Sequence, residues 1–262
     1  RSPERLESAS ESIDNVLHYC VDNLKSIFPG SGIFWDDQRE DAPEYGCCPR
    51  VVVDVVDGAR NLQKGGTEVS STLAIVRGDD IPLAIVSYPF GKERIVDVNG
   101  EVYWIPNHIE KRVDFIRGEI DRYRALPWKP KEMLEDFRVS ERYDVLDDDI
   151  RERLDELRYK VNGTIIRPAG SLAKMLMAIV SGSCDVFITR KKNRPINFYD
   201  YLAPYNIIKD IGGVFTDLDG NEPDGISDMD GIIAGSCVEN YEMFVGWMGG
   251  DEGMGLVGKK AE

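Results

Sequence analysis

Apolar residues recur along the first part of the chain with the spacing of a helix and then with that of strands. Between residues 10 and 28 they stand three and four apart, which predicts an amphipathic helix that the sequence PGSG ends. Residues 50–56 form a nearly continuous valine run, typical of a strand inside a sheet. Apolar runs at 69–76 and 82–88, and the segment 95–105 around Asn99-Gly100, predict two hairpins.

The pattern changes in the second half of the chain. Residues 107–160 are dense in charge and predict two helices, near 131–137 and 147–160. From residue 164 onward, short apolar runs alternate with helical patterns, which is typical of an α/β arrangement. We therefore expect a β-rich lobe over 1–110, a charged connecting segment over 111–160, an α/β lobe over 161–248 and a loose tail over 249–262.

Composition and charge argue against several classes of partner. The 262 residues are 42% hydrophobic, which is ordinary for a globular protein, and their net charge is −15. That charge disfavours nucleic acid and anionic membrane surfaces, although bound cations can still make an acidic pocket attractive to an anion. No apolar run approaches the roughly 20 residues of a membrane span, and the first residues do not resemble a signal peptide. A cytoplasmic protein is the expectation.

The residues available for chemistry are mainly carboxylates. The five cysteines show no regular spacing, and the two histidines, His18 and His108, lack the partners of a catalytic triad or a histidine-rich metal site.

The sequence DVVDG at 54–58 places two carboxylates in and just after the valine run. A buried carboxylate is costly unless a shifted pKa, a hydrogen-bond network or a cation offsets the cost. In a regular strand Asp54 and Asp57 would face opposite sides, whereas a break at Val56 would turn both toward one point. Gly58 would then begin a turn whose amides suit a phosphate. Taken alone, the motif fits either a capped turn or a cation site.

Three other acidic stretches have structural as well as functional interpretations. Asp36-Asp37 fits a solvated turn, and Asp200 fits the first turn of a helix, where the helix dipole favours it. The acidic segment 217–231 fits a hairpin turn better than a calcium loop, because Glu222 stands where such a loop needs glycine.

The order of these motifs is more specific than any one of them. WDD, DVVDGARN, GSLAKML and YDYLAPYNIIKDIGGVFTDLDG together resemble the inositol monophosphatase family, over about residues 10–237. That family lies within the superfamily of metal-dependent, lithium-sensitive phosphatases that includes fructose-1,6-bisphosphatase. The resemblance implies an α+β fold, a layered α-β-α-β-α sandwich of the sugar-phosphatase type, and a possible homodimer. It also implies a magnesium-dependent phosphomonoesterase with two or three Mg²⁺ ions, which lithium is expected to inhibit.

The resemblance assigns roles residue by residue. The implied metal ligands are Asp36, Asp54, the carbonyl of Val56, Asp57 and Asp200, with Asp36, Asp54 and Asp57 acting in catalysis. Metal-activated water would attack the phosphate ester, a chemistry that needs no histidine.

Further positions are implied to contact the substrate or support the metals. Gly58 and Ala59 match the turn that holds the phosphate, and Ser171 lies where the family contacts the alcohol part of the substrate. Asp14 and Asp37 are implied to lie outside the direct ligands and to support the metal cluster.

A basic run precedes the Asp200 helix. Arg190, Lys191 and Arg194 fit a solvated loop, but the same segment borders the substrate pocket in this superfamily. Positive charge there would suit a second phosphate. The expected substrate is therefore a small phosphorylated metabolite: inositol monophosphate, fructose 1,6-bisphosphate or a nucleotide 3′,5′-bisphosphate.

The chain also departs from the family pattern. Val55 replaces proline, Tyr199 replaces tryptophan, and Asp36 replaces a glutamate one methylene longer. Ala59 replaces a threonine whose hydroxyl would orient the attacking water, and losing such a group costs on the order of 10²–10⁴-fold in rate. The alternative hypothesis is therefore a catalytically impaired member that binds phosphorylated ligands or other proteins.

Overall fold

The computed structural model describes residues 3–35, 38–39, 49–91, 93–106, 138–141, 148–160, 165–166, 170–190 and 195–249. These residues combine helices with two β-sheets, so the fold class is α+β, as the sequence predicts. The chain divides into two compact units, each built from separate segments. The first comprises Arg1–Arg124, Gly170–Lys174 and Tyr199–Ile207; the second comprises Ala125–Ala169, Met175–Phe198 and Ile208–Glu262.

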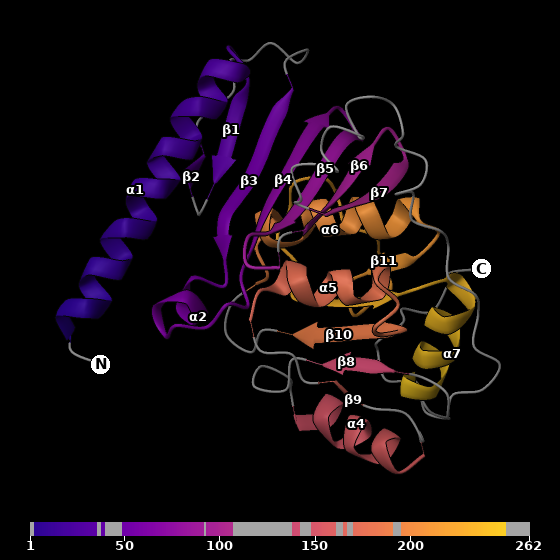
Figure 1. The fold of residues 1–262 in the computed structure, drawn as a ribbon. Coiled ribbons are helices and arrows are strands. Elements are labelled where there is room, and N and C mark those ends of the chain that lie inside the picture. The colour runs from indigo at the N-terminus through magenta and orange to yellow at the C-terminus, as the bar shows by residue number, and fades with distance from the viewer. Residues whose placement is uncertain are drawn as a thin grey trace. The chain divides into compact units, whose positions relative to one another are not determined.

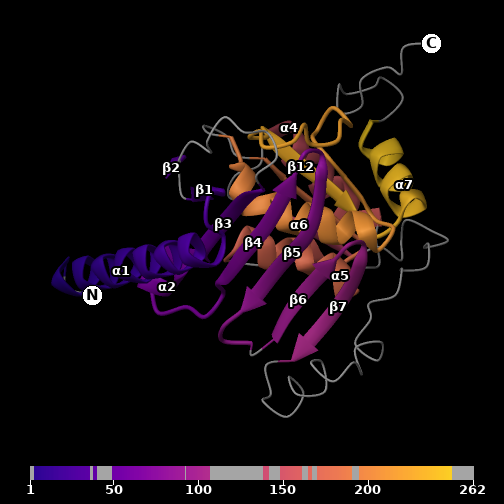
Figure 2. The ribbon, with the colours of Figure 1, turned by 90° about the horizontal axis from the view of Figure 1, so that it is seen from above.

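The first unit contains a seven-stranded sheet in the order β2-β1-β3-β4-β5-β6-β7 (Figure 1). Its strands are β1 (Gly32–Trp35), β2 (Gln38–Arg39), β3 (Arg50–Asp57), β4 (Ser70–Arg77), β5 (Asp80–Tyr88), β6 (Glu93–Val98) and β7 (Glu101–Pro106). β1 and β3 run parallel, and the other neighbouring strands are antiparallel. Figure 2 shows β3 to β7 following one another across the sheet.

Helix α1 (Pro3–Ile27) packs on β1 and β3. Val21 is buried in this contact and Leu17 and Leu24 are partly buried, against the alternate strand residues Val51, Val53 and Val55. Because side chains alternate along a strand, Val52 and Asp54 face the opposite side of the sheet. The helix predicted over 10–28 is confirmed, and it begins earlier, at Pro3.

The two predicted hairpins are confirmed as β4–β5 and β6–β7. Asn99 and Gly100 join β6 to β7 with φ values of 50° and 86°. Two successive positive φ angles are what a type I′ turn requires, so the Asn-Gly dipeptide adopts the turn that its chemistry favours.

The second unit contains a five-stranded sheet in the order β11-β12-β10-β8-β9. Its strands are β8 (Val139–Glu141), β9 (Ile165–Ile166), β10 (Val186–Arg190), β11 (Val214–Thr216) and β12 (Gly231–Gly235). Helices α4 (Asp148–Lys160) and α7 (Val238–Gly249) contribute Leu154, Leu157 and Phe244 to its core, beside Ile188 and Ile233.

Helices α5 (Leu172–Val180) and α6 (Phe198–Asp210) contribute residues to both units. Strand β8 was not expected, because it lies in the segment that the sequence marked as charged and helical. The helix predicted near 131–137 and the tail from residue 250 lie outside the described residues. Among the described residues, no helix combines the length and apolar character that crossing a bilayer requires.

Candidate metal centre

Asp54 and Asp57 lie at the end of β3, where its pairing with β4 is irregular. Asp54 lies opposite Thr72 and Asp57 opposite Ser70, so three residue steps on β3 match two on β4. Residues two apart on a strand share a face, and the extra residue of this β-bulge therefore brings both aspartates to one face of the sheet. The sequence suggested a break at Val56, whereas β3 continues to Asp57 and the bulge produces the shared face instead.

The carboxylates of Asp54, Asp57 and Asp200 converge, with one oxygen of each within 4.8 Å of the others. In the described part of the chain, no other three acidic, histidine or cysteine side chains lie close enough to share a cation. Burial, then the charges of Asp57 and Asp200, raise the pKa of Asp54 well above its usual value, whereas the Val56 N–H, 3.0 Å from Asp54 Oδ1, lowers it. These oxygens suit a hard divalent cation, whose charge would offset their repulsion.

Asp57 is held by donors from a distant part of the chain. Its Oδ2 accepts hydrogen bonds from Ser171 Oγ at 2.6 Å and from the Ala173 N–H at 2.8 Å. Ser171 precedes α5, and its hydroxyl also accepts the Lys174 N–H at 3.0 Å, which makes it the N-cap of that helix. The sequence predicts a substrate contact for Ser171; in the structure its side chain is buried and its hydroxyl meets Asp57.

Gly58 allows the close approach of three segments. Its φ is +90°, and a Cβ atom there would lie 2.9 Å from the Glu68 carbonyl oxygen and 3.2 Å from the Ser171 nitrogen. The same carbonyl accepts hydrogen bonds from the Ser171 N–H and from Asn61 Nδ2. Gly58 precedes the short helix α2 (Ala59–Gln63), so glycine is required both by the backbone and by the space.

Asp200 lies in the first turn of α6, and two contacts tie this helix to the sheet of the first unit. Thr72 Oγ1 on β4 donates to the Tyr199 carbonyl at 3.0 Å, next to Asp200. Further along the helix, Asn206 Nδ2 donates to the fully buried Asp97 on β6. The position of Asp200 beside Asp54 thus depends on contacts with β4 and β6.

The remaining predicted site residues are not brought to this cluster by any described contact. Asp36, Asp37, Lys191 and Arg194 lie outside the described residues. Asp14 lies in α1, where its side chain is not among those described. For these positions the roles implied by the resemblance stay predictions.

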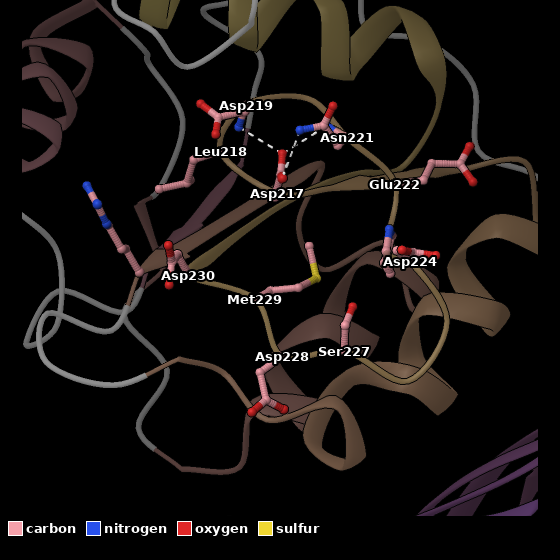
Figure 3. Close-up of a pocket in the computed structure, with 12 residues that line it drawn as sticks. Asp217, Leu218, Asp219, Asn221, Glu222, Asp224, Ser227, Asp228, Met229 and Asp230 are labelled. Carbon is pink, nitrogen blue, oxygen red and sulfur yellow. Dashed lines mark hydrogen bonds between the residues drawn. The ribbon is translucent and has the colours of Figure 1, made fainter.

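Arg190, at the end of β10, borders a pocket of about 470 Å³ in the second unit (Figure 3). The pocket is lined mainly by the acidic segment around residues 217–230. The Asp217 carboxylate accepts hydrogen bonds from the N–H groups of Asp219 and Asn221, both at 2.8 Å. The carbonyl oxygen of Asn221 accepts a hydrogen bond from the Asp217 N–H. Residues 217–221 therefore form a turn stabilised by the Asp217 side chain, in the acidic segment that joins the antiparallel strands β11 and β12, as the sequence predicts.

Sequence reasoning missed the hydroxyl residues Ser70, Ser71 and Thr72, which begin β4. Each lies within hydrogen-bond distance of the segments that carry the carboxylates. The available signal was a run of three hydroxyl side chains at the start of an apolar strand. Their role could not be inferred because the sequence does not reveal which residues of β3 they face.

Comparison with known proteins gives one family. The model of the inositol monophosphatase family matches residues 8–246. A search of curated proteins found no significant match.

Solved structures with the same fold include three bacterial proteins. An inositol monophosphatase from Zymomonas mobilis is 19% identical, with 92% of this chain and 83% of that one covered and a TM-score of 0.68. The extragenic suppressor protein suhB from Bartonella henselae is 18% identical, with 92% of this chain and 89% of that one covered and a TM-score of 0.70. Inositol monophosphatase II from Staphylococcus aureus is 13% identical, with 91% of this chain and 85% of that one covered and a TM-score of 0.68. These similarities bear out the layered α+β sandwich that the sequence motifs imply.

Proposed function

From the premise that this chain belongs to the inositol monophosphatase family, a family of metal-dependent phosphatases, we propose that it hydrolyses small phosphate monoesters with Mg²⁺ held by Asp54, Asp57 and Asp200. The observation that carries the proposal is the convergence of these three carboxylates within 4.8 Å. Bound cations would supply charge neutralisation and an activated water.

The residues of the site have distinct proposed roles. The three carboxylates hold the cations, and the carbonyl of Val56 completes the set that the family resemblance implies, for two or three ions. The turn at Gly58 and Ala59 would present its amides to the phosphate. As the family resemblance implies, Asp36 would orient the attacking water, and Asp14 and Asp37 would support the cluster from outside.

The proposed substrate is a phosphate monoester on a small cyclic polyol or ribose. The inositol monophosphatase SaIMPase-II has been solved with 2′-AMP and with inositol monophosphate bound, which shows that one such protein accepts both. Inositol monophosphate, fructose 1,6-bisphosphate and nucleotide 3′,5′-bisphosphates are therefore the first compounds to test. A bisphosphate would gain from Arg190, Lys191 and Arg194. Inhibition by lithium, assembly as a homodimer and a cytoplasmic location stay predictions.

The first experiment measures phosphate release from these compounds with Mg²⁺, with lithium added and with EDTA. We expect release that needs Mg²⁺ and that Asp54→Asn or Asp200→Asn lowers by at least about 100-fold, because each change removes a charged oxygen ligand. Asp22→Asn, an exposed change on α1, is the matched control and should leave the rate unchanged. Full metal-dependent release by the Asp54 and Asp200 variants would place the centre elsewhere.

A second candidate function rests on Ala59. An alanine at this position provides no hydroxyl for the attacking water, so the protein would bind phosphorylated ligands and turn them over slowly or not at all. Ala59→Thr is expected to raise kcat by at least about 10-fold, with Ala59→Val, of similar shape but without the hydroxyl, as control. A wild type that binds a phosphate ester but releases no phosphate, together with a gain only in the threonine variant, would establish the impaired form. Equal rates in all three proteins would show that residue 59 does not limit the reaction.

A further inference from the structure

The three hydroxyl residues at the start of β4 lie against the backbone and side chains of the candidate metal centre. Ser70 Oγ lies 3.4 Å from Asp57 Oδ2 and also contacts Ser171 Oγ. Ser71 Oγ donates to the Val55 carbonyl at 2.6 Å, inside the bulge between the two aspartates. The side chain of Ser70 is almost completely buried, at 1% exposure, so its hydroxyl depends on protein partners.

Counting protons limits the possible directions of the hydrogen bonds around Asp57. A serine hydroxyl donates one proton and accepts two. The 2.6 Å contact between Ser171 Oγ and Asp57 Oδ2 uses the proton of Ser171. This leaves Ser171 no proton for Ser70, and its oxygen also accepts the Lys174 N–H. The single proton of Ser70 therefore serves either its contact with Ser171 Oγ or its 3.4 Å hydrogen bond to Asp57 Oδ2. Ser70 thus donates toward Asp57, directly or through Ser171, and Ser171 itself donates to Asp57.

All these donors reach the same carboxylate oxygen. Ser171 and the Ala173 N–H bind Oδ2 of Asp57, and Ser70 Oγ lies 3.4 Å from the same oxygen. Hydrogen bonds to an ionised carboxylate are stronger than neutral ones, and the start of α5 adds the positive end of a helix dipole. Their effect is to fix the rotation of the carboxylate and to leave Oδ1 for a cation.

We propose that Ser70 is a positioning residue of the metal centre: its hydroxyl orients Asp57, together with Ser171, for cation binding. The inference rests on the proposed function, because it assigns Asp57 to a cation. The proposed role of Ser70 is specific to this chain, because it depends on a hydroxyl at residue 70 and on the strand register that places Ser70 opposite Asp57. Groups that orient metal ligands typically change metal affinity by 10- to 100-fold when removed.

The test is Ser70→Ala in the full chain, with Mn²⁺ binding followed by calorimetry and with the Mg²⁺ dependence of phosphate release. We expect the Mn²⁺ Kd and the half-saturating Mg²⁺ concentration to rise by about 10-fold. KM for the substrate at saturating Mg²⁺ should stay unchanged, because Ser70 does not touch the substrate. Ser70→Thr keeps the hydroxyl and should restore most of the affinity.

Ser140→Ala is the matched control. Ser140 on β8 is also fully buried, and its hydroxyl has no hydrogen-bond partner among the described residues. It should leave both metal measurements unchanged. If Ser70→Ala fails to fold, Ser70→Cys replaces the hydroxyl by a weak donor and is expected to weaken Mn²⁺ binding in the same direction.

The outcomes separate this inference from the proposed function. Unchanged Mn²⁺ affinity in folded Ser70→Ala would overturn the inference, even if the variant unfolds more readily in EDTA, because Ser70 would then be merely structural. Mn²⁺ affinity that Asp54→Asn does not alter would instead refute the metal centre itself.

Discussion

At the scale of the residue, the carboxylates of the valine-rich strand have a physical explanation. Asp54 keeps a raised pKa through burial and the nearby charges of Asp57 and Asp200. Asp57 is stabilised differently, by hydrogen bonds from Ser171 and the start of α5. The two aspartates of one motif therefore have different environments, and burial among like charges makes the ionised form of Asp54 costly without a cation.

This difference predicts how the stability of the metal-free protein depends on pH. Because the folded state raises the pKa of Asp54, it favours the protonated form, and this group destabilises the fold progressively as pH rises above the usual carboxyl range. In EDTA at pH 7, Asp54→Asn should therefore unfold a few degrees above the wild type, while near pH 4 the two midpoints should nearly coincide. Thermal unfolding followed by circular dichroism measures both.

Added Mg²⁺ provides the control. It should raise the midpoint of the wild type at pH 7 and leave that of Asp54→Asn almost unchanged, because the variant lacks a ligand charge. A variant that is less stable than the wild type in EDTA at both pH values would show that Asp54 is a structural group instead.

At the scale of the element, the bulge of β3 and the turn at Gly58 determine the site. The bulge aligns Asp54 and Asp57 on one face, and Gly58 lets the Glu68 segment and the start of α5 approach β3. The sequence indicated strand 50–56 and the alternation of strands and helices from residue 164, because both follow from local apolar periods. It did not indicate that β3 and the start of α5 meet through Asp57 and Ser171, which lie 114 residues apart.

The close approach at Gly58 predicts an unequal cost for two glycine substitutions. Gly58 and Gly30 have similar φ values, +90° and +83°, but a Cβ atom at Gly30 would have no neighbour within 4 Å. Gly30→Ala should cost about 1 kcal/mol from the backbone alone, and Gly58→Ala at least about 1 kcal/mol more, because its Cβ meets backbone atoms. Urea unfolding in EDTA measures both, and equal costs would mean that the segments separate easily.

At the scale of the whole molecule, the chain gathers its acidic cluster from segments that are far apart in sequence. The first unit includes Gly170–Lys174 and Tyr199–Ile207, which carry Ser171 and Asp200, beside the N-terminal sheet that carries Asp54 and Asp57. The net charge of −15 agrees with such a cluster, because cations can convert acidic surroundings into a receptor for phosphate. The family match over residues 8–246 covers all of these segments.

The sequence by itself determined the family, the acidic character of the candidate site and the local elements. Apolar periods and the Asn99-Gly100 turn are encoded in residues close to one another, and the order of the acidic motifs follows from the sequence alone, so none of them needs tertiary contacts. Only the tertiary structure decided how β3 pairs with β4, and hence that Ser70 lies opposite Asp57 and Thr72 opposite Asp54. Strand register depends on side chains from separate segments packing together, so the hydroxyl residues that hold the carboxylates became visible only in the folded chain.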